Sequence, residues 1–356
     1  MMTVEGASAD EVWRQVAARM QRDGVVQQSR DQLTRELVHV AITLTDPRQR
    51  LVFARAINPA FALADVLWVL AGANDADFLQ FWNRRIATYT DDKDPHVLHG
   101  AYGYRLGSQP TLSQATATRL RHVYPGNPPR FDQLKAAAEA LRHTPHSRQV
   151  VLHIWDAARD LPAPEPRSRD IPCNVMSHLM IRGGQLEWLQ IMRSNDLVWG
   201  LPYNIIQFTS MQEMVAGWLG VDVGTYVHIS DSLHVYERHW PLLNALADVA
   251  TPIPHNEGDL RIDSYEAWET LWSRLVDGAL ALTEHTDADS LLGIAAELAD
   301  LPAAYHAWVV VLTAEALRRR GHSAAADEVG AQAGPYWGAS WRLWRAAQAS
   351  REEPAR

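Results

Sequence analysis

The sequence predicts a single α/β domain in which helices precede and follow a central mixed sheet. Segments rich in β-branched residues cluster in the middle of the chain, between segments with helical periodicity. Neither an internal repeat nor a low-complexity linker divides the 356 residues, and one large α/β domain can reach this length. We therefore expect one domain over residues 1–356, with a helical part at 241–350 and a frayed tail at 351–356.

The first part of the chain is expected to contain three helices and one strand. Apolar residues recur at helical spacing over residues 9–22, which predicts an amphipathic helix. β-Branched residues alternate with others over 37–44, which predicts a strand. Asn58 and Pro59 then open an apolar, buried helix, because asparagine caps a helix and proline fits its first turn. Another helix is expected over residues 75–86.

The centre of the chain is expected to hold a β-hairpin followed by a helix. Residues 176–182 and 185–192 read as strands, and the Gly183-Gly184 pair between them suits a turn that needs positive φ. A helix is expected over 205–219. The other elements expected here are a helix at 131–143 and strands at 149–155 and 226–230.

The composition is that of an ordinary globular protein and argues against several classes. The formal charge of −9 disfavours broad nucleic-acid binding, which depends on a basic surface, although a local pocket for one phosphate is compatible with it. The longest apolar run is too short to cross a bilayer, and no signal peptide is evident. Fifteen scattered histidines lack ligand spacing, so we expect no metal. The single cysteine favours a cytoplasmic location.

That cysteine, Cys173, is the strongest candidate for a reactive group. A lone thiol cannot form an internal disulfide, and a free cysteine often serves only as a small core residue. Cys173, however, follows Pro172 and lies upstream of Arg193 and Ser194, polar residues that can hold an anion. This context favours a nucleophile that attacks a phosphorylated substrate.

The order of several short segments around Cys173 resembles the thymidylate synthase family. That family joins a Pro-Cys nucleophile, an Arg-Ser-x-Asp segment, a Gly-x-Pro-Phe-Asn segment and a His-x-Tyr segment in this order. Further pieces upstream extend the resemblance to about residues 30–240. Each piece is weak alone, but the shared order makes the resemblance specific. The matching segments are 64–68, 101–103, 147–149, 172–173, 193–196, 200–204 and 234–236.

The resemblance implies a folate-dependent one-carbon transfer to C5 of a pyrimidine nucleoside monophosphate. The thiolate of Cys173 would add to C6 of the ring and make C5 nucleophilic toward the methylene unit of 5,10-methylenetetrahydrofolate, the co-substrate. Arg193 and Ser194 would bind the 5′-phosphate. The arginines that bind the phosphate would also favour the thiolate form of Cys173, because a neighbouring cation lowers the pKa of a thiol.

The resemblance also assigns the base, the sugar and the folate to particular residues. Asn204 would face the pyrimidine edge, where its amide can satisfy N3–H and O4 of uracil. His234 and Tyr236 would meet the sugar hydroxyls. Asp196 is similar to the carboxylate that holds the pterin ring, and Tyr102 to the tyrosine that assists proton removal at C5.

A homodimer with shared phosphate sites is implied as well. Arg148 fits one of the arginines that the family takes from the partner subunit. Arg30 is the candidate for the mobile phosphate arginine near the N-terminus, with Arg35 as an alternative. The implied fold is a large twisted mixed sheet with helices packed on one face and the dimer formed across the other.

Several positions depart from the family pattern. Asn174 replaces a histidine beside the nucleophile, Asp65 replaces a helix glutamate that organises water and proton transfer, and Gln149 replaces an arginine. The tryptophan that shields the C5-methylene intermediate from water has no clear counterpart, and Tyr89 is nearest by position. The short apolar C-terminal segment that closes over the folate has none.

These departures affect the exclusion of water more than covalent attack or base recognition. If water reaches the C5-methylene intermediate before hydride does, the product is a 5-hydroxymethyl pyrimidine and tetrahydrofolate is released. The sequence therefore favours hydroxymethylation of a dUMP-like nucleotide, with methylation to thymidylate as the alternative and a non-catalytic nucleotide-binding homologue as a third reading. Ribose against deoxyribose, cytosine as the base, and the pathway served stay open at this point.

Overall fold

The computed structural model describes residues 1–29, 32–91, 94–121, 131–161, 168–245 and 253–352. The chain groups into two compact units, each assembled from three separate stretches of sequence. The sheet unit comprises Met1–Arg55, Ala136–Ala157 and Pro172–Ile253, and the helical unit comprises Ala56–Lys135, Ala158–Ile171 and Pro254–Arg356. The expectation of one domain over residues 1–356 stays a prediction.

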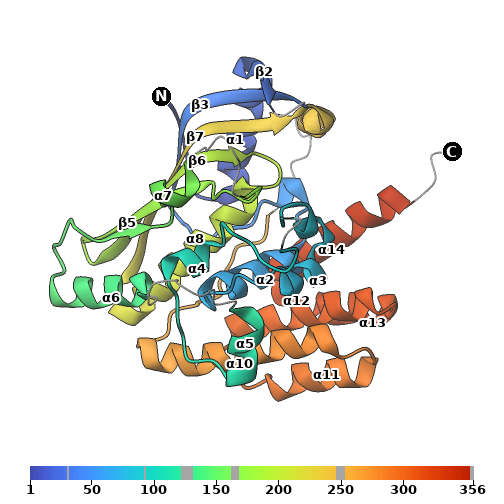
Figure 1. The fold of residues 1–356 in the computed structure, drawn as a ribbon. Coiled ribbons are helices and arrows are strands. Elements are labelled where there is room, and N and C mark those ends of the chain that lie inside the picture. Colours follow the sequence, from blue (N-terminus) through green and yellow to red (C-terminus); the bar gives the residue numbers. More distant parts are fainter. Residues whose placement is uncertain (30–31, 92–93, 122–130, 162–167, 246–252, 353–356) are drawn as a thin grey trace. The chain divides into compact units, whose positions relative to one another are not determined.

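A seven-stranded mixed sheet is the framework of the sheet unit (Figure 1). Its strands are β1 (Met2–Gly6), β2 (Val25–Ser29), β3 (Gln32–Leu44), β4 (Val151–His153), β5 (Asn174–Arg182), β6 (Gln185–Asp196) and β7 (Asp222–Tyr236). The strand order is β1-β3-β7-β6-β5-β4, with β2 paired to β3. β1 pairs with β3, and β6 with β7, in parallel, whereas the other pairs are antiparallel. The mixed sheet expected from the sequence is thus confirmed.

Helices form much of the rest of the described chain. They are α1 (Ala9–Asp23), α2 (Pro59–Leu70), α3 (Ala76–Trp82), α4 (Tyr102–Leu106), α5 (Gln114–Leu120), α6 (Gln133–His143), α7 (Ala157–Asp160), α8 (Leu201–Leu219), α9 (Trp240–Ala245), α10 (Tyr265–Glu284), α11 (Ala288–Glu297), α12 (Ala303–Arg319), α13 (Ser323–Ala331) and α14 (Gly334–Glu352). The last five lie mostly within residues 241–350, the part expected to be helical. None of the helices in the described residues is long and apolar enough to span a bilayer.

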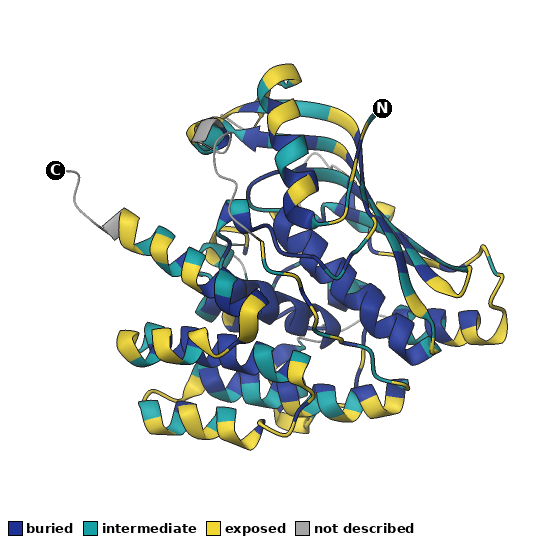
Figure 2. Cartoon of the chain, turned by 180° about the vertical axis from the view of Figure 1, so that it is seen from behind, coloured by how far each residue is buried: buried dark blue, intermediate teal, exposed yellow. Residues whose placement is uncertain are grey.

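One face of the sheet is buried beneath α1 and α8, which both contact the strands. Leu152, Gln190 and His228 form a buried row across β4, β6 and β7 on this face. The neighbouring row on the opposite face is only partly covered: Val151 is 47% exposed, and His178, Leu189 and Val227 are half-buried. Figure 2 colours the chain by burial. Packing of helices on one face, as the sequence implied, is therefore confirmed.

Local signals in the sequence correctly placed several elements. The side chain of Asn58 accepts the N–H of Phe61 at 3.1 Å and so caps α2, as predicted. Gly183 and Gly184 adopt φ values of 57° and 79° in the turn between β5 and β6, a region that most side chains avoid. The hairpin prediction is confirmed for the same physical reason that motivated it.

Several predicted boundaries were wrong. β3 begins at Gln32, earlier than the predicted 37, because its first half pairs with the fully exposed β2 and shows no burial alternation. α8 begins at Leu201 rather than 205, because Pro202 fits its first turn. α14 continues to Glu352, two residues into the stretch 351–356 that was predicted to fray, and the fraying itself stays a prediction. The last four residues of that tail lie outside the described residues.

Aromatic packing accounts for much of the core of the helical unit. Trp268 and Trp272 of α10 stack with ring centroids 5.0 Å apart. Trp308 of α12 meets Trp272 edge-on at 6.4 Å, and Trp337 of α14 meets Trp308 at 6.2 Å. Such pairs add to the burial of large apolar surfaces. This packing accounts for four of the 14 tryptophans of the chain.

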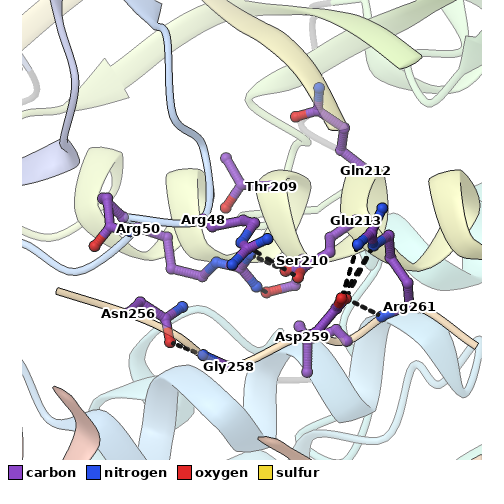
Figure 3. Close-up of polar contacts among 12 residues, drawn as sticks. Arg48, Arg50, Thr209, Ser210, Gln212, Glu213, Asn256, Gly258, Asp259 and Arg261 are labelled. Atoms are coloured by element: carbon purple, nitrogen blue, oxygen red, sulfur yellow. Dashed lines mark hydrogen bonds and ion pairs between the residues drawn. The ribbon is translucent and has the colours of Figure 1, made fainter. Parts of the chain in front are cut away.

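A buried ion pair joins the loop after β3 to α8. Arg50 is 1% exposed and Glu213 is 0% exposed. The guanidinium of Arg50 donates to the carboxylate of Glu213 and, through Nη1, to the hydroxyl of Ser210 at 2.9 Å (Figure 3). Nε of Arg48 lies 4.0 Å from the same carboxylate. The pair anchors the loop, because separating two buried charges is costly.

Replacing Glu213 with alanine is expected to lower the free energy of unfolding by about 3–5 kcal/mol, because the Arg50 charge would stay buried without its carboxylate. Urea unfolding followed by circular dichroism would measure the loss. Asp300→Ala is the matched control, since Asp300 pairs with Arg274 at the surface, where such pairs contribute less than about 1 kcal/mol. Equal losses in the two variants would contradict the anchoring role.

Candidate active site

Cys173 lies immediately before β5, and Arg193 reaches it from the neighbouring strand β6. The backbone N–H of Arg193 donates to the carbonyl of Cys173 at 2.9 Å, and Nε donates to the carbonyl of Pro172 at 2.9 Å. Nη2 lies 4.0 Å from Sγ of Cys173. A cation this close favours the thiolate form of a half-buried cysteine. The arrangement suits the sulfur for nucleophilic attack.

Trp155, just after β4, also contacts Arg193. The guanidinium carbon of Arg193 lies 5.2 Å from the centre of the indole ring, a cation–π distance. The sheet therefore orients Arg193 through an aromatic surface as well as through backbone hydrogen bonds. The sequence reasoning did not find Trp155, because nothing in the pattern of β4 distinguishes this tryptophan from a core residue.

Asn174, which occupies the place of the family histidine, belongs to a buried amide network. It is 0% exposed, and its Oδ1 accepts Nε2 of Gln190 at 2.6 Å. Gln190 in turn accepts the hydroxyl of Ser177 at 2.6 Å through Oε1. The residue after Cys173 is thus engaged with the strands and supplies no titratable group beside the sulfur.

Half-exposed polar residues line up across the ends of β6 and β7. Ser194 and Asp196 lie opposite Ser232 and His234 in the parallel register of the two strands. The rings of His234 and Tyr236 meet edge-on at 5.3 Å. In the described part of the chain, the Ser194 hydroxyl has no hydrogen-bond partner. The pairing of the strands therefore brings together four predicted site residues that lie about forty positions apart in the sequence.

Asp196 also fixes the turn that leads into α8. Its Oδ1 accepts the backbone N–H groups of Val198 at 2.7 Å and Trp199 at 3.0 Å. Its Oδ2 has no hydrogen-bond partner among the described residues. One carboxylate oxygen is thus structural and the other is available to an N–H donor.

Asn204 lies in the first turn of α8 and is 8% exposed. Its Nδ2 donates to Oδ1 of Asn195 on β6 at 3.2 Å. Within the described residues, its Oδ1 makes no hydrogen bond. The amide can therefore offer one acceptor and one remaining N–H to a ligand.

Of the two arginines predicted to complete the phosphate site, only one lies among the described residues. Arg148 lies in the exposed turn before β4, where its carbonyl accepts Nε2 of His178 at 3.2 Å. Its side chain points to no partner in the described chain. Arg30 lies outside the described residues.

Asp65 and Tyr102 belong to the helical unit. Asp65 lies within α2, whose residues are all buried, and Tyr102 begins α4. The two helices touch through backbone, because a Cβ atom at Gly103 would lie 1.8 Å from the carbonyl oxygen of Val69. This close approach fixes the two candidate proton-handling residues on adjacent helices.

A buried polar cluster supports the loop before Tyr102. Arg105 of α4 makes two hydrogen bonds to Asp160, at 2.9 Å and 3.2 Å. Asp170, three residues before Cys173 in the sequence, accepts the N–H of Gly100 at 2.7 Å. Burial raises the pKa of the Asp170 carboxyl to about 6, against the opposing influence of the Gly100 hydrogen bond and the Arg105 charge.

The sheet unit thus gathers most of the candidate site at one end of its central strands. Sequence reasoning missed several residues that support this site, because their roles depend on strand pairing and burial rather than on local pattern. The roles assigned to the candidates stay predictions. The gathered residues are Cys173, Arg193, Ser194, Asp196, Asn204, His234 and Tyr236. The missed ones are Trp155, which contacts Arg193, and Asn195, His228 and Tyr226, which hydrogen bonds link to Asn204.

Comparison with known proteins gives consistent matches. The family model for thymidylate synthase matches residues 9–271. The chain is 34% identical over 239 residues to the deoxyuridylate hydroxymethyltransferase of Bacillus phage SP01, covering 66% of this chain and 59% of that protein. It is 33% identical over 224 residues to the deoxyuridylate hydroxymethyltransferase of Pseudomonas phage M6, covering 60% and 57%. The chain therefore spans less than two thirds of the length of these relatives.

The raised pKa of Asp170 predicts a pH-dependent stability. An aspartate in an unfolded chain titrates near about 4, whereas the folded pKa is about 6. The folded state therefore holds this proton more tightly, so the group stabilises the fold below about pH 4 and loses that contribution as the pH rises through about 6. We expect Asp170→Asn to raise the melting temperature at pH 7.5 and to leave it nearly unchanged at pH 4.

Thermal unfolding of both proteins at the two pH values measures this effect. Asp160→Asn is the control, because it removes the partner of the buried Arg105 and should lower the melting temperature at pH 7.5. No gain for Asp170→Asn at pH 7.5 would rule out burial as the cause of the raised pKa.

Proposed function

Because this chain belongs to the thymidylate synthase family, we propose that it transfers a one-carbon unit from 5,10-methylenetetrahydrofolate to C5 of deoxyuridylate and releases the 5-hydroxymethyl product. The approach of Arg193 to the sulfur of Cys173 is the observation that carries the proposal. The similarity to two deoxyuridylate hydroxymethyltransferases supports the choice of substrate and product.

In the proposed reaction the thiolate of Cys173 adds to C6 of the pyrimidine. The electron pair of the C5–C6 double bond moves toward O4. C5 then bonds to the methylene carbon of the folate as one of the two carbon–nitrogen bonds of that carbon breaks, and the freed nitrogen takes up a proton. Loss of the C5 proton and cleavage of the second carbon–nitrogen bond leave an exocyclic methylene group. Water adds to that carbon, and the returning electron pair expels the thiolate from C6. No hydride is consumed, so tetrahydrofolate leaves without oxidation.

Separate groups of residues would hold the two substrates. Arg193 and Ser194 would bind the phosphate, the arginine through a forked contact and the serine through its available hydroxyl. His234 and Tyr236 would meet the sugar. The Oδ2 atom of Asp196 is suited to accept N–H groups of the pterin ring, because Oδ1 already holds two backbone donors. The residues present therefore fit a folate.

Asp65 and Tyr102 would manage the proton that leaves C5. The carboxylate of Asp65 can order water, and the phenol of Tyr102 can pass the proton on. Asn174 offers no imidazole beside Cys173. The departures that bear on the exclusion of water, among them the lack of a clear counterpart to the shielding tryptophan, favour capture of the intermediate by water over hydride transfer. Reductive methylation to thymidylate is the competing outcome.

The proposed enzyme is a homodimer formed across the half-exposed face of the sheet. That face carries apolar side chains such as Leu189, Ile191, Val227 and Ile229, which a second copy could cover. Arg148 stands at its margin, next to His178 of the same face, with an exposed side chain. From there it would reach the phosphate of the neighbouring subunit.

The identity of the product tests the proposal. Incubation of the purified protein with deoxyuridylate and methylenetetrahydrofolate should yield a nucleotide heavier by one CH2O unit, together with tetrahydrofolate, as measured by mass spectrometry and absorbance. Cys173→Ala should abolish turnover, because the chain has no other cysteine to add to C6. A product heavier by one CH2 unit alone, with dihydrofolate formed, would instead identify reductive methylation.

Mixing two inactive variants tests the shared site. Cys173→Ala and Arg148→Ala homodimers should each be weakly active or inactive. Subunit exchange should restore about a quarter of the wild-type activity, because half of the dimers are then mixed and each holds one intact site. Activity in steady-state assays would be compared before and after exchange. No recovery, despite exchange shown by native mass spectrometry, would mean that each site is built from one chain.

A further inference from the structure

A chain of four hydrogen-bonded side chains runs from Asn204 into the core of the sheet unit. Nδ2 of Asn204 donates to Oδ1 of Asn195 at 3.2 Å. Nδ2 of Asn195 lies 3.0 Å from Nε2 of His228, and Nδ1 of His228 lies 2.9 Å from the hydroxyl of Tyr226. Asn195 is 2% exposed, and His228 and Tyr226 are completely buried. No other hydrogen bond of these four side chains occurs in the described part of the chain.

Burial keeps the inner half of this chain uncharged. It lowers the pKa of His228 to about 3 and raises the pKa of Tyr226. The imidazole is therefore neutral at physiological pH, with one ring nitrogen donating and the other accepting. Because Nε2 accepts from the amide of Asn195, the ring proton resides on Nδ1, which faces Tyr226. The direction of each hydrogen bond thus depends on its neighbour.

The amide of Asn195 is also enclosed by the backbone. A Cβ atom at Gly200 would lie 2.3 Å from Oδ1 of Asn195 and 3.1 Å from the backbone nitrogen of Asp196. The start of α8 therefore packs directly against this amide, which glycine alone permits. Asn195 has little room to turn without breaking its contacts.

We propose that Asn195 is a positioning residue that fixes the amide of Asn204 in the orientation that reads uracil and rejects cytosine. The inference rests on the proposed function and deepens it. Asn195 itself does not touch the substrate in this account. It acts through Asn204, whose Oδ1 and remaining N–H face the ligand.

The two bases differ in the pattern that they present to Asn204. Uracil offers a donor at N3 and an acceptor at O4, which match an amide that presents Oδ1 and one N–H in that order. Cytosine offers an acceptor at N3 and a donor at N4, so the amide must turn over. Turning it would place the oxygen of Asn204 against the oxygen of Asn195, unless Asn195 also turned and the proton of His228 moved to Nε2. Because the four side chains are hydrogen-bonded in series, none of these changes can occur without the others.

Two substitutions of nearly equal size separate this role from a structural one. Asn195→Leu removes the acceptor and lets the Asn204 amide rotate. Asn195→Asp keeps an acceptor for Nδ2 of Asn204, because an ionised carboxylate has only acceptors, and it accepts from His228 once the ring proton moves. The affinities of the full-length wild type and of each variant for deoxyuridylate and deoxycytidylate are measured by equilibrium dialysis without folate.

The expected result is a change in the ratio of the two affinities. Wild type should prefer deoxyuridylate, and Asn195→Leu should reduce that preference about tenfold, the cost of one buried hydrogen bond. Asn195→Asp should retain the preference. If Asn195→Leu does not fold, Asn195→Ala replaces it, with the same expectation.

Several outcomes would overturn the inference. An unchanged ratio in Asn195→Leu, or equal reductions in Asn195→Leu and Asn195→Asp, would show that Asn195 does not orient the amide. A wild type that prefers deoxycytidylate would show that the oxygen and nitrogen of the Asn204 amide are exchanged relative to the orientation proposed here. A wild type that binds neither nucleotide would refute the proposed function itself. That result differs from one in which both nucleotides bind but Asn195 does not orient the amide of Asn204.

Discussion

The nearly complete burial of α8 is the constraint on which the sheet unit depends. Almost every residue of this helix is buried, yet several are polar. Buried polar groups destabilise a fold unless they are hydrogen-bonded. Gln212 therefore donates to the carbonyls of the strands, Glu213 binds Arg50, and Asn204 binds Asn195. The hydrogen bonds that satisfy these buried groups hold α8 against the sheet. One of them also orients the side chain of Asn204, which we propose to face the base.

The parts of the fold set by local chemistry could be predicted from the sequence. The cap at Asn58 and the turn at Gly183-Gly184 need only a short stretch of chain to form, and both were found. The contact of Cys173 with Arg193 followed from the order of motifs. The parallel pairing of β6 with β7 and the contact of Trp155 with Arg193 could not be predicted, because both depend on which distant strands become neighbours.

The departures from the family pattern acquire a physical meaning in the structure. Asn174, which stands in place of a histidine, has a structural role: Gln190 donates to its side-chain oxygen, and Ser177 donates to Gln190. The amide oxygen of Asn174 is therefore engaged within the protein, and Nη2 of Arg193 is a cationic group that lies 4.0 Å from the sulfur of Cys173. In the proposed reaction, attack on the ring and control of water would rest on different residues, so that one could change while the other is kept.

The contact of Gly103 with the carbonyl of Val69 has a consequence for evolution. Helix spacing normally follows the volume of the side chains between two helices, so it drifts as a core accumulates substitutions. Here main chain rests on main chain, and no side chain sets the gap. Relatives can thus diverge widely in the surrounding core and still inherit the same separation between the backbones that carry Asp65 and Tyr102, provided that the glycine persists.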